Sequence, residues 1–506
     1  MIRLAIIFFL LFIIESESFQ FNLEELNKLR QLFNDSDRRM EEATRGQRKN
    51  AAIVIGNGRG GKSTLINYIM GNELEANRPH TFENIKITKA NNNIKGPEIG
   101  AGSLSTTTIP TKWSSTRPEL QNLDIWDTAG FADNRGVMQD FNNSFHLYHL
   151  TRKVENLKLI LVISFNEIIN DNVEQVRKLL SSLEEYFTIY RFRTFFPSIS
   201  VIISKAPKSD DYDNLVDHEY ITDILFDRLL SNPKMDISED SKQFVQNIIK
   251  NNNRLAFFKK AQQTGIVTSD IDVNIIPAIN NCKRIIKSCR QDMGFTFSPQ
   301  SKSSLKNHTG TLDINEITDF GKILCNSFDE KFAASCQSKD TNTLQTNKAD
   351  LNRIYESLNP LSNNPDPEVK IQTLEMISDN LKNFNKENDV ANKISLTKFI
   401  DFILKEDKML DVIKLVNSLF TSVKVKIESL FTSCSYKLNE ITKDEYDKEN
   451  ATNAENSKKI VNNLNDYIIK RVIPSDKKSG WRRFLDVLTT FLKMEVSTSI
   501  VYLNRL

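Results

Sequence analysis

The stretch from Gly56 to Ser63 holds the residue types and the spacing that bind phosphate. It reads GNGRGGKS and fits the pattern G-x-x-x-x-G-K-[ST], between an apolar run and apolar residues at helical spacing. Glycines let backbone N–H groups approach phosphate oxygens, and the positive end of the following helix dipole points to the same place. The sequence therefore predicts a phosphate-binding loop between a strand and a helix. The alternative is a glycine-rich turn that binds no ligand.

This loop and the residue after it supply most of the predicted nucleotide-binding residues: Gly56, Asn57, Gly58, Arg59, Gly60, Gly61, Lys62, Ser63 and Thr64. Lys62 is predicted to neutralise the charge of the β- and γ-phosphates. The Ser63 hydroxyl is predicted to bind Mg²⁺.

A second motif follows the apolar run from Leu123 to Trp126. It reads Asp127-Thr128-Ala129-Gly130 and fits D-x-x-G, a short pattern that gains weight from its place after the loop and at the end of a predicted strand. Asp127 is predicted to hold Mg²⁺ through a water, and the Gly130 N–H to meet the γ-phosphate.

Strand-like and helix-like segments alternate around these motifs. Strands are predicted at 52–55, 123–126, 159–165, 199–203 and 272–279, and helices after the loop and at 138–148, 173–187 and 215–230. This order predicts an α/β fold, a three-layer sandwich with a mostly parallel sheet. The polar stretch 72–102 is expected to be mobile. A short amphipathic helix over 23–42 is expected to pack on the domain, with a membrane surface as the alternative.

The second half of the chain predicts helices and no strand. Its best-defined piece carries an apolar stripe spaced alternately by four and three residues: Met409, Ile413, Val416, Phe420, Val423, Ile427 and Leu430. Flanking apolar residues widen this stripe, which favours a helix buried in a bundle over an intermolecular coiled coil. The predicted organisation is an N-terminal helix within 19–50, an α/β domain at 51–290, a linker at 291–313 and a helical domain at 314–506. The end of the chain, 481–506, is too charged to span a membrane, but surface contact remains open.

The first eighteen residues have the layout of a secretory signal peptide. Arg3 precedes the apolar run 4–14, and small residues follow at 16 and 18. A buried N-terminal strand or helix is the alternative. The five cysteines contain no CxxC pair and predict neither a zinc site nor a disulfide framework. His146 and His149 form a helical pair without an evident third metal ligand. The net charge of +2 gives no reason to expect nucleic acid as a partner.

The glycine loop, a threonine cluster at 106–108 and the D-x-x-G motif follow in the order of a G domain. Residues 51–281 therefore resemble the G domain of regulatory GTPases, in particular the guanylate-binding and dynamin-like large GTPases and the AIG1-type GTPases. The guanylate-binding pattern G-x-x-R-x-G-K-S is met by Gly56, Arg59, Gly61, Lys62 and Ser63.

The resemblance implies GTP and Mg²⁺ as ligands and further roles for single residues. Arg59 would act in cis as an arginine finger, the alternative being an exposed arginine that contacts solvent or an acidic neighbour. Among the three threonines, Ile109 favours Thr106 as the one that binds Mg²⁺ and senses the γ-phosphate. The implied catalytic residues are then Lys62, Arg59 and Thr106, and the implied metal ligands are Ser63, Thr106 and Asp127.

The guanine-reading motif departs from the family pattern [NT]-K-x-D. The sequence Ser204-Lys205-Ala206-Pro207 keeps the lysine, so Lys205 is a predicted nucleotide-binding residue, but it lacks the aspartate. Asp210 and Asp211 follow a few positions later. Either a rearranged loop uses one of them, or base specificity is relaxed. No glutamine stands where small GTPases orient the attacking water.

The sequence thus predicts a GTP-binding protein with Mg²⁺-dependent hydrolysis, coupled to conformational change or to self-association through the G domain or the helical region. Two alternatives stay open. One is a P-loop ATPase or nucleotide kinase, and the other is a nucleotide-gated helical scaffold with negligible turnover. Secretory or membrane association is expected if the N-terminal signal is used, and a cytoplasmic protein otherwise.

Overall fold

The computed structural model describes residues 21–91, 93–100, 107–131, 135–169, 174–232, 235–307, 312, 314–381, 389–441 and 459. The chain forms two compact units, 1–309 and 310–506, and each is considered by itself. The predicted signal peptide at 1–18 and the segment 481–506 lie outside the described residues.

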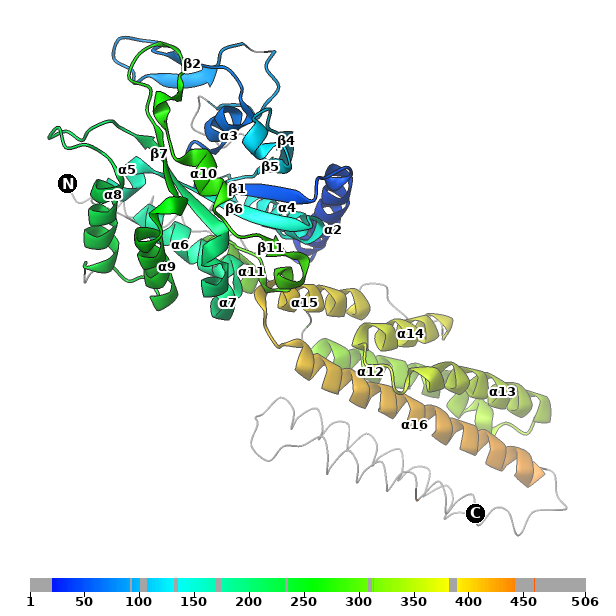
Figure 1. The fold of residues 1–506 in the computed structure, drawn as a ribbon. Helices are drawn as coiled ribbons and strands as arrows, with labels where there is room; N and C mark the ends of the chain where they lie inside the picture. The colour runs from blue at the N-terminus through cyan, green and yellow to red at the C-terminus, as the bar shows by residue number, and fades with distance from the viewer. Residues whose placement is uncertain are drawn as a thin grey trace, which may run out of the picture. The chain divides into compact units, whose positions relative to one another are not determined.

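The first unit is built on a mixed, mostly parallel sheet with the strand order β10-β8-β7-β6-β1-β5-β4, and β11 pairs beside β6 (Figure 1). The strands are β1 Asn50–Gly56, β4 Thr111–Ser114, β5 Leu123–Asp127, β6 Asn156–Ser164, β7 Ile199–Ala206, β8 Leu255–Lys259, β10 Asp272–Val273 and β11 Ile285–Ile286. The five strands from β8 to β5 run parallel, whereas β10, β4 and β11 pair antiparallel. The predicted α/β class with a mostly parallel sheet is confirmed.

Helices cover both faces of the sheet because side chains of the central strands alternate between two cores. In β1, Ile53 and Ile55 enter one core, and Val54 enters the other. The first core is covered by α4 Val137–Lys153, α5 Phe165–Ile169, α6 Glu174–Tyr186, α7 Thr188–Phe195, α8 His218–Leu225 and α9 Glu239–Lys250. The second is covered by α3 Lys62–Met70 and α10 Ile275–Asn280. Burial on two faces explains why these strands are continuous apolar runs.

The prediction of a last strand over 272–279 is wrong. Only the two residues of β10 are extended, and α10 follows, because Asn274 adopts a left-handed conformation (φ 67°) and the Asp272 carboxylate accepts from Ile275 N at 3.0 Å. The last parallel strand is instead β8, a five-residue strand that pairs with β7 and that the sequence analysis missed.

The prediction of a mobile stretch over 72–102 is also wrong in part. It contains β2 Leu74–Asn77 and β3 Lys86–Lys89, which form a second, antiparallel sheet with β9 Gly265–Ile266. The partner strand β9 comes from a distant part of the chain, so the stretch carries no local sign of this pairing.

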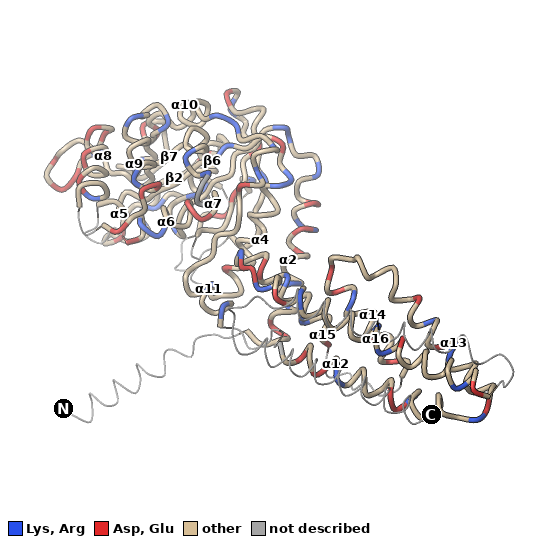
Figure 2. The backbone as a smooth tube through the Cα atoms, turned by 90° about the horizontal axis from the view of Figure 1, so that it is seen from below, with Lys and Arg blue, Asp and Glu red and all other residues tan. Residues whose placement is uncertain are grey.

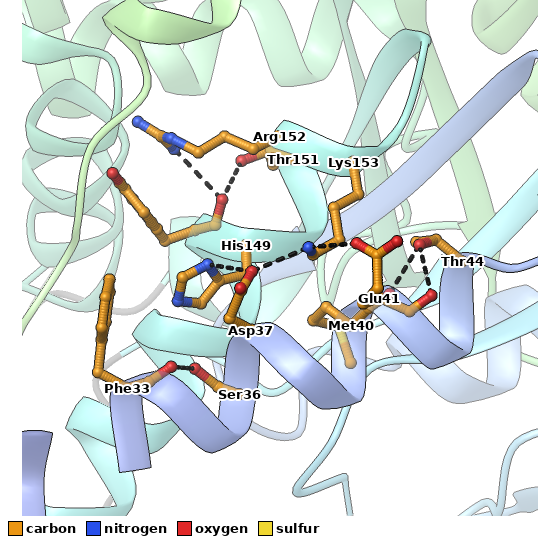
Figure 3. A network of polar contacts seen from close by, with 11 residues as sticks. Phe33, Ser36, Asp37, Met40, Glu41, Thr44, His149, Thr151, Arg152 and Lys153 are labelled. Atoms are coloured by element: carbon orange, nitrogen blue, oxygen red, sulfur yellow. Dashed lines mark hydrogen bonds and ion pairs between the residues drawn. The ribbon is translucent and has the colours of Figure 1, made fainter. Parts of the chain in front are cut away.

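The predicted N-terminal helix is α2 Leu23–Thr44, and it packs along α4. Figure 3 shows Asp37 and Glu41 of α2 facing His149 and Lys153 of α4. One oxygen of Asp37 lies 3.1 Å from His149 Nδ1 and 2.9 Å from Lys153 Nζ, and Glu41 lies 2.6 Å from Lys153 Nζ. Burial lowers the pKa of His149 to about 4, against the effect of Asp37. This histidine therefore belongs to the packing of α2 on α4.

The segment from Arg290 to Ser298, called here the α4 strap, runs along another side of α4. Its hydrogen bonds to α4 are Arg290 Nη1 to Thr151 O (2.8 Å), Arg152 Nη2 to Met293 O (2.8 Å), Thr296 N to Ser144 Oγ (3.0 Å) and Ser298 N to Asp140 Oδ2 (2.7 Å). Phe295 stacks on Tyr148 of α4 with ring centroids 4.2 Å apart. The short helix α11 Pro299–Lys306 follows. Most of the predicted linker 291–313 is therefore packed within the first unit.

The second unit is helical in its described part, as the sequence predicts. Its helices are α12 Ile314–Phe328, α13 Thr341–Leu358, α14 Pro367–Asn380, α15 Val390–Leu404 and α16 Met409–Ile441. The stripe of α16, including Val416, Val423 and Ile427, is buried against the other helices, as in a bundle. A disulfide joins Cys336 to Cys434, contrary to the expectation of no disulfide framework. None of the helices in the described part of the chain is long and apolar enough to cross a membrane.

Candidate functional site

The two predicted motifs lie side by side at the carboxyl end of neighbouring parallel strands. The glycine loop follows β1 and leads to α3 on one face, whereas the D-x-x-G residues follow β5 and lead to α4 on the other face. Where successive helices leave to opposite faces, α/β sheets form a ligand-binding crevice. Phe131 N donates to Gly56 O at 3.1 Å, and the Thr128 hydroxyl donates to Val54 O at 2.6 Å. The two loops are thereby held against each other.

Two positions of the site favour glycine over residues that carry a side chain. Gly61, the residue directly before α3, has a left-handed backbone conformation (φ 87°). A Cβ on Gly130 would lie 2.5 Å from Gly58 N, so a side chain there would push the two loops apart. Arg59 is exposed at the rim of the loop, and Thr64 lies in the first turn of α3. The loop thus packs tightly beneath its exposed rim.

Lys62 is buried at the start of α3, where its ammonium group lies within the glycine loop. Its Nζ donates to Asn57 O at 2.9 Å and to Gly56 O at 3.3 Å. Only 7% of the residue is exposed. A phosphate oxygen could replace these carbonyl acceptors, because both are neutral and the ammonium group favours a charged partner.

Asp127 ends β5 beside Lys62, with 1% of the residue exposed. Its Oδ2 accepts hydrogen bonds from the Ser63 hydroxyl at 3.0 Å and the Thr107 hydroxyl at 3.1 Å. Its buried Oδ1 has no hydrogen-bond partner in the described part of the chain. Burial raises the pKa of Asp127, while the charge of Lys62, the two hydroxyls and the backbone N–H of Thr128 act in the opposite direction.

A carboxylate and two hydroxyls therefore converge at one point, and hard divalent cations prefer such oxygen ligands. Thr106, favoured from the sequence, lies outside the described residues. Its neighbour Thr107 is the threonine that the structure brings to Asp127. Among the described residues, no group of three or more His, Cys, Asp or Glu side chains could hold a metal ion. The oxygen cluster at Asp127 is not such a group, because it contains a single carboxylate beside two hydroxyls.

A third parallel strand, β7, contacts the glycine loop through two residues near its carboxyl end. Lys205 Nζ donates to Arg59 O at 2.7 Å, and the Ser204 hydroxyl donates to Gly60 O at 2.5 Å. Lys205 itself has a left-handed backbone (φ 56°). The lysine of the incomplete guanine-reading motif thus contacts the glycine loop directly.

The two candidate guanine-reading aspartates differ in their surroundings. The Asp210 carboxylate accepts hydrogen bonds from Asn214 Nδ2, Asn214 N, Tyr212 N and the Tyr220 hydroxyl, which lower its pKa. Asp211 is exposed. In Figure 2, acidic residues gather around α8 and the turn that precedes it. Asp210 therefore stabilises its own turn. Asp211, whose side chain is exposed, is the better placed of the two to contact a guanine base.

Glu167, a buried carboxylate beside the glycine loop, is a site residue that the sequence did not predict. It lies on α5, directly after β6, and 9% of the residue is exposed. Burial raises its pKa, and hydrogen bonds from Ser164 N and Asn57 and the charge of Lys62 act against this effect. The sequence contains one sign of its role: it stands just after the carboxyl end of a predicted buried strand, where α/β sheets bind their ligands.

Comparison of the chain with models of protein families and with curated proteins finds no match. Function is therefore inferred from the chemistry of this site.

Proposed function

We propose that the chain binds GTP together with Mg²⁺ and hydrolyses it, as a nucleotide-controlled switch or assembly protein. The observation that carries this proposal is the arrangement at Asp127. Its buried carboxylate has one oxygen without a partner among the described residues and lies beside the buried ammonium group of Lys62, at the start of α3. An uncompensated buried oxygen costs free energy, and a cation that binds there would offset this cost.

The residues at this point fit Mg²⁺ by their chemistry. Ser63 and Thr107 supply hydroxyl oxygens and Asp127 supplies carboxylate oxygens, which are ligands of the kind that Mg²⁺ accepts beside waters and phosphate. When bound, the ion would neutralise charge on the phosphates. Thr106, the residue favoured by the family resemblance, remains a second candidate ligand.

The surrounding groups suit a triphosphate. Lys62 would exchange its carbonyl acceptors for phosphate oxygens, and the first N–H groups of α3 would donate to the same anion. Arg59 has an exposed side chain at the loop rim and would serve as the arginine finger. Gly130 packs against the glycine loop, since a Cβ on it would lie 2.5 Å from Gly58 N, and its N–H would sense the third phosphate.

The first unit is accordingly proposed to be a P-loop G domain that resembles those of guanylate-binding, dynamin-like or AIG1-type GTPases. The contact between Lys205 and Arg59 O supports this assignment, because it places the lysine of the incomplete guanine motif beside the phosphate loop. A second copy of the chain and a membrane surface are proposed as partners of the nucleotide-bound form.

An ATPase or nucleotide kinase is the second candidate, and one observation favours it. The Asp210 carboxylate is engaged within its own turn and does not offer free acceptors to a guanine base. The third candidate is a nucleotide-gated helical scaffold with negligible turnover.

Binding of labelled GTP in the presence of Mg²⁺, competed with unlabelled ATP, tests the proposal. We expect GTP to compete better than ATP, Lys62→Ala to lose binding, and the exposed control Lys250→Ala to bind as the wild type does. Equal competition by ATP would support the second candidate. Binding without release of phosphate would support the scaffold.

A further inference from the structure

Thr107 connects the carboxylate of Asp127 to an arginine that follows the D-x-x-G motif. Its hydroxyl donates to Asp127 Oδ2 at 3.1 Å, and its carbonyl oxygen accepts a hydrogen bond from Arg135 Nη2 at 2.9 Å. Four residues later, Thr111 pairs with Asp127 where β4 runs antiparallel to β5. The backbone from 107 to 111 therefore passes beside this carboxylate, and Arg135 contacts it at its first residue.

Arg135 reaches Thr107 from the beginning of a firmly packed helix. It lies two residues before α4, and Gly136, which has a positive φ of 104°, leads into the helix. Asp140 N donates to Gly136 O at 3.1 Å, and the Asp140 carboxylate accepts from Ser298 N of the α4 strap at 2.7 Å. The arginine thus extends from an element that the α4 strap and α2 hold in place.

The segment 107–110 lies on the side of the site where the third phosphate is proposed to bind. Thr108 and Pro110 line a small cavity together with Gly130, the residue proposed to sense that phosphate, and with residues of α4. Ile109 is partly buried against the first core. Because a cavity adjoins the segment, polar contacts contribute more to its position than they would in a close-packed core.

Resting on the proposed nucleotide binding, we propose that Arg135 is a positioning residue that makes the site prefer a nucleoside triphosphate over a diphosphate. It holds Thr107 beside Asp127, where the threonine hydroxyl would serve as a ligand of Mg²⁺. A ligand that is held in place before the nucleotide arrives reduces the conformational entropy that binding costs. A diphosphate gains little from this contact, because the glycine loop and Lys62 would hold its phosphates.

Titration of the full chain with fluorescent GDP and with a fluorescent, non-hydrolysable GTP analogue, each in the presence of Mg²⁺, tests the proposal. We expect Arg135→Gln to lose about tenfold in affinity for the triphosphate, the effect of one hydrogen bond from a charged group, and to bind GDP as the wild type does. Arg135→Lys keeps the charge and a donor, and it should recover part of the loss.

Arg254 supplies a matched control. It also donates to a backbone carbonyl, that of Phe196, but it lies directly before β8, at the edge of the sheet opposite to the site. Arg254→Gln should keep the wild-type ratio of the two affinities, whatever its effect on stability.

A purely structural arginine would change both affinities alike. That outcome, or an unchanged preference for the triphosphate in Arg135→Gln, would overturn the proposal. If Arg135→Gln does not fold, the same pair of titrations on Arg135→Lys decides, and a wild-type ratio together with a wild-type exchange pattern would overturn it.

Hydrogen exchange of the nucleotide-free chain supplies a readout that does not depend on binding. Amides within 107–114 should exchange faster in Arg135→Gln than in the wild type, while those of the central strands exchange alike. Equal exchange within 107–114 would show that Arg135 does not hold this segment and would overturn the proposal. If the wild type binds neither nucleotide, the proposed function itself fails, and the triphosphate preference fails with it even where the exchange result shows the contact.

Discussion

Replacement of Asp127 by asparagine is expected to stabilise the metal-free protein and to remove its response to Mg²⁺. The wild-type carboxylate is buried, one of its oxygens has no partner among the described residues, and burial raises its pKa. A buried polar group left in this way costs about 1–3 kcal/mol. Asparagine keeps an acceptor for the hydroxyls of Ser63 and Thr107 but carries no charge. We expect the metal-free variant to gain about 1–3 kcal/mol, or about 2–6 °C in Tm.

Asp124 offers a matched control on the same strand. It is as buried as Asp127, with 2% of the residue exposed, but its carboxylate is fully engaged. Its oxygens accept from Arg48 N at 2.8 Å and from the Ser114 hydroxyl at 3.2 Å, and the Arg48 guanidinium lies 3.4 Å away. Asp124→Asn should therefore destabilise the protein, by about 1–2 kcal/mol.

Thermal unfolding of the metal-free proteins near pH 7, followed by unfolding with Mg²⁺ and GTP, measures both effects. The ligands should raise the Tm of the wild type and have little effect on Asp127→Asn. Because the pKa of Asp127 is raised in the folded state above the usual 3.8, the wild type gains stability as the pH falls toward that value, and the advantage of the variant should shrink over the same range. If Asp127→Asn loses as much stability as Asp124→Asn, the carboxylate is a structural residue and the reasoning is wrong.

Other predictions concern the loop contact, the disulfide and the buried histidine. Gly130→Ala should weaken nucleotide binding by about tenfold or more, because its Cβ would lie 2.5 Å from Gly58 N; an unchanged Kd in a fluorescent-nucleotide titration would contradict this. Reduction of the disulfide between Cys336 and Cys434 should lower the unfolding free energy of the second unit by about 2–4 kcal/mol in urea titrations, whereas Cys336→Ser should not respond to reductant. The pKa of His149 is lowered to about 4, so the folded state binds its proton more weakly than the unfolded chain, and stability should fall between about pH 6.5 and 4. His149→Gln should lose this part of the pH dependence, and an identical profile would show that other groups cause it.

The parts of the fold that the sequence predicted depend on local patterns. Strands β1, β5, β6 and β7 are apolar because both of their faces are buried, and this pattern is visible in the residues themselves. Strand β8 has only five residues and was overlooked in favour of the longer apolar run at 272–279, which a left-handed Asn274 divides into a strand end and a helix. The pairing of β2 with β9 in the second sheet and the packing of the α4 strap join distant segments, which no local pattern reveals.

In the site, too, local motifs could be predicted and contacts between distant segments could not. The glycine loop and the motif at Asp127 are each short stretches of consecutive residues, and the structure brings them together at the carboxyl ends of β1 and β5. Glu167 belongs to no motif and becomes visible only when α5 packs beside the loop. The role of Asp210 was also hidden, because its hydrogen bonds depend on the fold of its turn.

The α4 strap also bears on the order in which the first unit is completed during synthesis. Its residues, 290–298, leave the ribosome after every strand of the sheet, and at about 5–20 residues per second they follow α4 by about 7–30 s. During that interval the aromatic side of α4 that Phe295 and Phe297 finally cover has no covering strap. A nascent chain that stops at residue 290 would keep this aromatic surface exposed to chaperones and to other chains. The enclosure of α4 thus depends on a segment that is synthesised after the whole sheet.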